Sequence, residues 1–135
     1  MTRSADGAPL EVRAPTGEEA LVVVLVNAPP ADAPRIARAL VERGLAACVN
    51  VIPSVTSIYF WEGKLCEEGE STLMIKTRAA LVQEITAVVK GLHPFTVPEV
   101  VALALVPGVG NLDYLRWVAT EATGTHRVAG TDEAG

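Results

Sequence analysis

The chain has 135 residues, 50% of them apolar, and a formal net charge of −5 at pH 7. This length suits one domain with its own core, and the acidic balance, without any run of basic residues, excludes nucleic acid and anionic membranes as expected partners. The longest apolar runs cover residues 20–26 and 100–106, far short of the roughly 20 residues that cross a bilayer.

The two cysteines, Cys48 and Cys66, show neither the paired spacing of a zinc site nor a disulfide framework. We therefore expect a reducing, cytoplasmic setting. Residues 1–18 and 124–135 are small, polar or charged for the most part and show no periodicity, which predicts a flexible tail at each end. Between the tails, residues 19–123 should form the one folded domain.

The first predicted strand covers residues 20–27, a Val-rich run typical of a strand buried on both faces. A helix follows, with Asp32 as a candidate N-cap and Pro34 suited to its first turn. The apolar stripe of this helix consists of Ile36, Ala37, Leu40 and Val41. Gly44 fits the left-handed residue that ends many helices.

The second predicted strand is long and covers residues 46–61, roughly twice a typical strand length. Pro53 should force a bend or a bulge midway. The strand ends in Tyr59, Phe60 and Trp61. Because consecutive strand residues point to opposite faces, these bulky rings should lie on both sides of a sheet.

A turn at residues 62–64 and an acidic stretch should separate this strand from a returning strand over residues 71–76. Thr77 is a candidate N-cap for a second helix. The apolar face of that helix consists of Leu81, Ile85, Val88, Val89 and Leu92. Gly91 and Pro94 should end it.

A fourth strand is predicted over residues 98–106, followed by a loop at residues 107–110. Asn111 is a candidate N-cap for a short third helix. The predicted order is strand, helix, strand, strand, helix, strand, with an extra C-terminal helix. This is the α+β, ferredoxin-like plan, in which two helices cover one face of a four-stranded antiparallel sheet.

The long strand outreaches its helical cover. About 16 residues at roughly 3.3 Å each span on the order of 50 Å, whereas a first helix of some 12 residues spans only about 18 Å. The hairpin should therefore project beyond the helices, leaving its aromatic end and open strand edges in need of a partner. We predict a closed homo-oligomer.

Four segments together resemble the CutA family of divalent-cation tolerance proteins: residues 46–64, 74–77, 92–99 and 110–117. They occur in the family's order and spacing over about residues 20–121. The resemblance implies a ferredoxin-like subunit in a homotrimer built like the PII signalling proteins. It also implies a link to tolerance of copper and other divalent metals.

Three features depart from the family pattern. Phe95 stands where the family usually has Tyr after His-Pro, so one hydroxyl is missing from that neighbourhood. Cys66 and the long N-terminal tail are not family features either.

Cys48 and His93 are the candidate metal ligands. The thiolate of Cys48 suits a soft ion such as Cu(I), although a free cysteine also serves as a small buried apolar residue. The imidazole of His93 suits a metal or a proton shuttle. Its position at the end of the second helix equally suits an interaction with unpaired helix carbonyls.

A candidate cleft between subunits gathers Tyr59, Trp61, Lys76, His93 and Glu99. Lys76 ends one strand and Glu99 begins another, so the two allow a salt bridge or an acid–base pair. Interfaces commonly hold small-ligand pockets.

The acidic turn residues Glu62, Glu67, Glu68 and Glu70 form a second cluster. Their carboxylates suit hard cations, or else a solvated hairpin tip.

The sequence shows no nucleophile with a base and an orienting group, so we expect no enzyme. The leading hypothesis is a homotrimer that binds copper or another divalent metal. The first alternative is a PII-like sensor that holds a small anionic metabolite between subunits, with charge supplied by Lys64, Lys76 and Arg78. The second alternative is a purely structural trimer that anchors other proteins.

Overall fold

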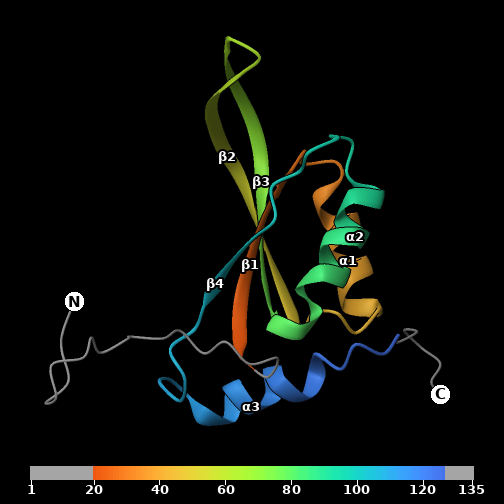
Figure 1. Ribbon diagram of the computed structural model, residues 1–135, viewed down its shortest axis with the longest axis vertical. Helices are drawn as coiled ribbons and strands as arrows, with labels where there is room; N and C mark the ends of the chain where they lie inside the picture. The colour runs from red at the N-terminus through yellow and green to blue at the C-terminus, as the bar shows by residue number, and fades with distance from the viewer. Residues whose placement is uncertain (1–19, 127–135) are drawn as a thin grey trace, which may run out of the picture.

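A four-stranded sheet with two helices on one face forms the frame of residues 20–126, which the computed structural model describes (Figure 1). The strand order is β2-β3-β1-β4, and every neighbouring pair is antiparallel. This confirms the predicted α+β, ferredoxin-like plan. The elements in chain order are β1 (Leu21–Ala28), α1 (Ala33–Glu42), β2 (Cys48–Trp61), β3 (Lys64–Arg78), a 3-10 turn (Ala79–Leu81), α2 (Val82–Leu92), β4 (Val101–Ala104) and α3 (Leu112–Glu121).

The core lies between the sheet and helices α1 and α2. Alternate strand residues point toward the helices, and those of β1 and β3 are buried there: Val22, Val24, Val26, Leu73 and Ile75. The helices meet them with Ile36, Leu40, Ile85 and Val89, none of which has measurable exposure. Each such side chain contributes roughly 1.5–3 kcal/mol through burial.

Strands β2 and β3 form a ribbon that projects past the helices (Figure 1). β2 has 14 residues, or about 46 Å at roughly 3.3 Å each, against about 15 Å for the 10 residues of α1. Near the tip, Phe60 is 71% exposed and Ile58 is 63% exposed. The predicted projection of the hairpin is therefore confirmed.

A β-bulge interrupts β2 where Pro53 predicted it. Ile52 pairs with Thr72, but the next pair is Val55 with Glu70, so β2 contains one residue more than β3 in this interval. Ser54 adopts a φ of 63° at the bulge. Proline has no backbone N–H to donate to a neighbouring strand. Because β2 is an edge strand with β3 on one side only, Pro53 is tolerated there.

Two predicted boundaries around β3 are wrong. β3 begins at Lys64 rather than at residue 71, because its acidic first half pairs with β2 along the whole ribbon. Thr77 does not cap α2. It is a buried residue of β3 whose hydroxyl donates to the carbonyl of Leu45 at 2.6 Å, and the 3-10 turn separates it from α2.

The helix caps also differ from each other. Asp32 stands at the N-cap of α1 without a side-chain hydrogen bond to the backbone, and its carboxylate instead accepts from Arg35 at 2.9 Å. The side chain of Asn111 does cap α3, accepting from the backbone N–H of Asp113 at 3.0 Å. β4 is shorter than predicted and comprises only Val101–Ala104.

The predicted tails over residues 1–18 and 124–135 lie outside the described residues, except for residues 124–126. That short piece contacts the domain: the N–H of Gly124 donates to the carbonyl of Gly44 at 2.8 Å. Gly44 has a φ of 71°, in the left-handed region that glycine adopts without a steric penalty.

We expect Gly44→Ala to lower the free energy of unfolding by more than about 1 kcal/mol, since it combines a positive φ with a new steric overlap. The added Cβ would overlap the carbonyl oxygen of Thr125. Gly91→Ala is the matched control, because its Cβ would meet nothing within 4 Å in helix α2, and it should raise stability by about 0.5–1 kcal/mol. Urea unfolding at one protein concentration measures both variants. Equal stability of Gly44→Ala and the parent chain would contradict the first expectation.

Candidate functional site

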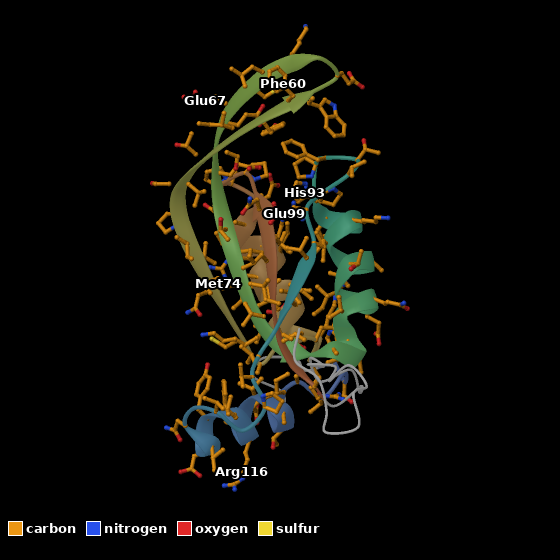
Figure 2. The ribbon with its side chains drawn as sticks, turned by 60° about the vertical axis from the view of Figure 1, so that its left-hand side comes forward. Phe60, Glu67, Met74, His93, Glu99 and Arg116 are labelled. Atoms are coloured by element: carbon orange, nitrogen blue, oxygen red, sulfur yellow. The ribbon has the colours of Figure 1, made fainter. Side chains whose placement is uncertain are left out.

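A cleft of about 790 Å³ lies between the projecting hairpin and the segment that joins α2 to β4. We call it the hairpin cleft. In Figure 2 the hairpin arches above this joining segment, with His93 and Glu99 below it. The lining residues are Ser57, Ile58, Tyr59, Trp61, Cys66, Glu68 and Glu70 of the hairpin, Pro94, Phe95, Thr96, Val97 and Glu99 of the segment, and Asn27 of β1.

The β-bulge selects which hairpin side chains reach the cleft. Beyond the bulge, Tyr59 pairs with Cys66 and Ser57 pairs with Glu68. Directly paired residues of antiparallel strands share a face, so these four side chains belong to one side of the ribbon. Phe60 belongs to the other side and does not line the cleft.

Asn27 anchors the floor of the cleft through its side chain. Its Oδ1 accepts from the hydroxyl of Thr72 at 2.6 Å, and its Nδ2 donates to Oε1 of Glu99 at 3.2 Å. This relay runs from β3 through β1 to the residue Glu99 in the segment before β4. The carboxylate of Glu99 is thus held by Asn27 of β1, which is itself held by Thr72 of β3.

His93 is buried directly behind the cleft, at the C-cap of α2. Its Nε2 lies 2.8 Å from the backbone carbonyl of Asn27, and its Nδ1 accepts from the N–H of Phe95 at 3.0 Å. A carbonyl only accepts and an N–H only donates, so the ring is the neutral tautomer with its proton on Nε2. Both nitrogens are thus engaged, and a metal ion would have to displace one of these bonds.

The hairpin cleft is acidic. Glu68, Glu70 and Glu99 line it, and no Lys or Arg among residues 20–126 does. Glu70 is only 7% exposed, and within residues 20–126 its carboxylate has no hydrogen-bond or salt-bridge partner. A buried carboxylate without a partner is energetically costly. A positively charged ligand group at this wall would lower that cost.

The other predicted site residues lie elsewhere within the chain. Lys76 donates to Oδ1 of Asn50 at 2.6 Å and lies 5.8 Å from the ring centre of Tyr114. It is four residues along β3 from Thr72, about 13 Å at strand spacing, and does not line the hairpin cleft. Cys48, half-buried, is the cross-strand partner of Lys76.

Cys48 and His93 therefore do not meet in one chain. His93 binds Asn27, which pairs with Thr72 in the middle of β3, whereas Cys48 pairs with Lys76. Among residues 20–126 no three His, Cys, Asp or Glu side chains are grouped to hold a metal ion. Five residues were predicted for a cleft between subunits, and that cleft stays a prediction. Within the single chain, Tyr59, Trp61 and Glu99 line the hairpin cleft, and His93 supports it from behind.

Sequence reasoning alone does not single out Asn27, Glu70 or Cys66 as cleft residues. Cys66 lines the cleft, and its thiol donates weakly to the carbonyl of Lys64 at 3.7 Å. Glu70 belongs to β3 and not to a turn. The alternation of Cys66, Glu68 and Glu70, with period two, is the signal that all three share one strand face.

Tyr59 is the cleft residue with a perturbed acidity. Its pKa is raised above the ordinary value of 10.0, first by partial burial and then by the negative charges of Glu68, Cys66 and Glu70. A hydrogen bond from the phenol to Glu68 adds to this shift. The neutral phenol is thereby kept as a hydrogen-bond donor in an acidic environment.

The model of the CutA1 divalent ion tolerance protein family matches residues 22–121. The chain is 57% identical over 83 residues to the Protein CutA homolog of Xenopus laevis, covering 62% of this chain and 54% of that protein. It is 48% identical over 97 residues to the divalent-cation tolerance protein CutA of Thermus thermophilus, covering 71% and 92%. The chain thus spans about half the length of the Xenopus relative and nearly all of the Thermus one.

Solved structures resemble the fold closely. The divalent cation tolerance protein of Thermus thermophilus superposes with a TM-score of 0.69 at 46% identity, covering 73% of this chain and 94% of that one. The PII-like protein CutA of Nostoc sp. PCC 7120, in apo form, gives 0.70 at 38% identity, covering 75% and 96%. No helix within residues 20–126 has the length and apolarity needed to cross a membrane.

We expect the phenol of Tyr59 to titrate above pH 10.0 in the folded chain. A Tyr114→Phe background leaves Tyr59 as the one tyrosine, so absorbance at the phenolate band reports it alone. Glu68→Gln should move the midpoint down toward 10.0, whereas Glu67→Gln, whose residue lies on the opposite ribbon face, should not. Identical midpoints in both variants would contradict the contribution of Glu68 to the raised pKa.

The raised pKa of Tyr59 also makes the stability of the fold depend on pH. Because the folded pKa exceeds the unfolded one, Tyr59 stabilises the fold below about pH 10 and loses that contribution as pH rises through its folded pKa.

Proposed function

Because the chain belongs to the CutA1 divalent ion tolerance protein family, we propose that it contributes to metal tolerance by binding divalent cations such as copper. It does so without catalysis, as a homotrimer in the cytoplasm. The observation that carries this proposal is the charge of the hairpin cleft: three carboxylates and no basic side chain from residues 20–126.

A divalent cation would bind here through few protein ligands. Since no group of three ligands exists within residues 20–126, one or two Glu carboxylates would hold the ion and water would complete its shell, as is common for hard cations. Cys66 adds a sulfur ligand to the same wall, which suits copper. Cys48 and His93 remain predicted ligands, and neither would act with the other from the same chain.

The homotrimer is supported by an uncovered sheet surface. On the side of the sheet away from α1 and α2, Leu25 pairs with Met74 and Val101, and Val23 pairs with Leu103. Val23 is itself buried, so we call the other four residues, Leu25, Met74, Val101 and Leu103, the open face. Leu103 is 53% exposed and Val101 is 48% exposed. Contiguous apolar area of this kind, with an exposed hairpin beside it, favours association with further copies.

The PII-like alternative, an anionic metabolite, has less support from the site. One similar structure is named a PII-like protein, but the basic residues predicted to bind an anion are placed otherwise. Lys76 binds Asn50, and Arg78 donates to the carbonyl of Ala122 at 2.7 Å. Lys64 starts β3 at the hairpin tip and does not line the cleft. The acidic wall would repel an anion.

We expect isothermal titration with Cu(II), Zn(II) and, under reducing conditions, Cu(I) to show binding to the full chain. Glu70→Gln should weaken it about tenfold or more, the value of one charge-assisted contact. Glu67→Gln removes the same charge from the opposite ribbon face and should change affinity less than about twofold, as a screened surface charge does.

Separate Cys48→Ser, Cys66→Ser and His93→Gln variants identify any further ligand. Absence of binding by all three ions, or equal weakening by Glu67→Gln and Glu70→Gln, would reject metal binding in the cleft.

We expect sedimentation to give three times the 14.2 kDa mass of one chain. Leu103→Glu places a charge on the open face and should shift the equilibrium to smaller species, because an unpaired charge is costly in an apolar interface. Val41→Glu is the control and should stay assembled. Val41 was predicted to belong to the apolar stripe of α1, but its side chain is 39% exposed and is not among the buried residues of that helix. A stable monomer of the parent chain at micromolar concentration would reject the homotrimer.

A further inference from the structure

We propose that the hairpin cleft binds a small organic polycation, an aliphatic amine with two or more ammonium groups. The inference concerns the same cleft as the proposed function but does not require that a metal bind there. It rests on three properties of the wall: an unpartnered buried carboxylate, separated acidic groups, and aromatic and apolar surface between them.

The first property is the position of Glu70. It is 7% exposed and lines the cleft, and no hydrogen bond or salt bridge within residues 20–126 satisfies its carboxylate. A buried carboxylate is stabilised by hydrogen-bond donors, and most strongly by a positively charged one. An ammonium group supplies a positive charge and up to three N–H donors in one small group.

The second property is the spacing of the negative charges. Glu68 and Glu70 come from the same face of β3, whereas Glu99 belongs to the joining segment and is tied to Asn27. These residues line one cleft, yet they are not grouped as a metal cage. Separated anions match a ligand whose positive charges are also separated along a chain.

The third property is the surface between the charges. Tyr59, Trp61 and Phe95 contribute aromatic rings to the wall, and Pro94 and Val97 contribute apolar surface. Aromatic faces attract ammonium groups, and the methylene chain of an aliphatic amine would be covered by the apolar residues. A volume of about 790 Å³ also falls in the range of small-molecule sites, roughly 300–1,000 Å³.

The side chain at position 95 fits this ligand class, because Phe95 lines the cleft with an aromatic ring. The Phe95 ring lies 5.0 Å from the His93 ring, centre to centre. The backbone N–H of Phe95 donates a hydrogen bond to Nδ1 of His93. The wall thus presents an aromatic ring there without a hydroxyl. Neutral His93, with both nitrogens engaged, adds no positive charge against an ammonium group.

The test is isothermal titration of the full chain with 1,5-diaminopentane and spermidine. 1,5-Pentanediol is the control probe, since it has the same carbon chain without charge. We expect both amines to bind and the diol not to bind. Glu70→Gln should weaken amine binding about tenfold or more, while Glu67→Gln should change it less than about twofold.

A second variant keeps the test independent of Glu70. Trp61 is 54% exposed, so Trp61→Ala should fold normally, as circular dichroism would verify, and should weaken the amines about threefold or more through loss of cation–π contact. No heat with either amine would overturn the inference, as would equal loss in Glu67→Gln and Glu70→Gln, which indicates nonspecific attraction to the acidic chain.

The same titrations separate this inference from the proposed function. Binding of Cu(II) or Zn(II) without binding of the amines would reject the polycation and leave metal binding standing. Amine binding without metal binding would support the polycation and reject metal binding in this cleft.

Discussion

One additional residue in β2 determines which side chains face the cleft. Side chains alternate along a strand, so an insertion of one residue exchanges the two faces for everything beyond it. Before the bulge, Asn50 shares a face with Met74; after it, Tyr59 shares that face with Cys66. Without the bulge, Phe60 would stand on the cleft side and Tyr59 on the other. The bulge at Pro53 and Ser54 is therefore the constraint on which the site depends.

The cleft is held by the core rather than by the hairpin alone. Asn27 lies near the end of the buried strand β1, and its backbone and side chain bind His93, Glu99 and Thr72. These hydrogen bonds connect the joining segment to the two central strands of the sheet. The wall that carries Glu99 is thus fixed to the most buried part of the domain. The opposite wall, the projecting ribbon, is stabilised mainly by pairing between β2 and β3.

Local chemistry predicts several elements correctly. Asn111 as a helix cap and Pro53 as a bulge are decided by a residue's own geometry and hydrogen-bonding groups. The predicted start of β3 is too late, because its acidic residues suggest a turn. Pairing with β2 overrides that preference, because the hydrogen bonds between the two strands join backbone groups and do not depend on the side chains. The prediction for Thr77 fails because a helix cap and a buried strand residue cannot be told apart from the sequence. Only the structure shows that its hydroxyl donates to the carbonyl of Leu45.

The sequence by itself determined the element order, the overlong hairpin and the family, because periodicity, turn residues and motif order are properties of the chain read along its length. Only the tertiary structure decided which charged groups share a site. It separated Lys76 from Glu99 and brought Glu70 and Cys66 to the wall. The physical reason is that strand register and the bulge set side-chain faces across distances in sequence that no local pattern encodes.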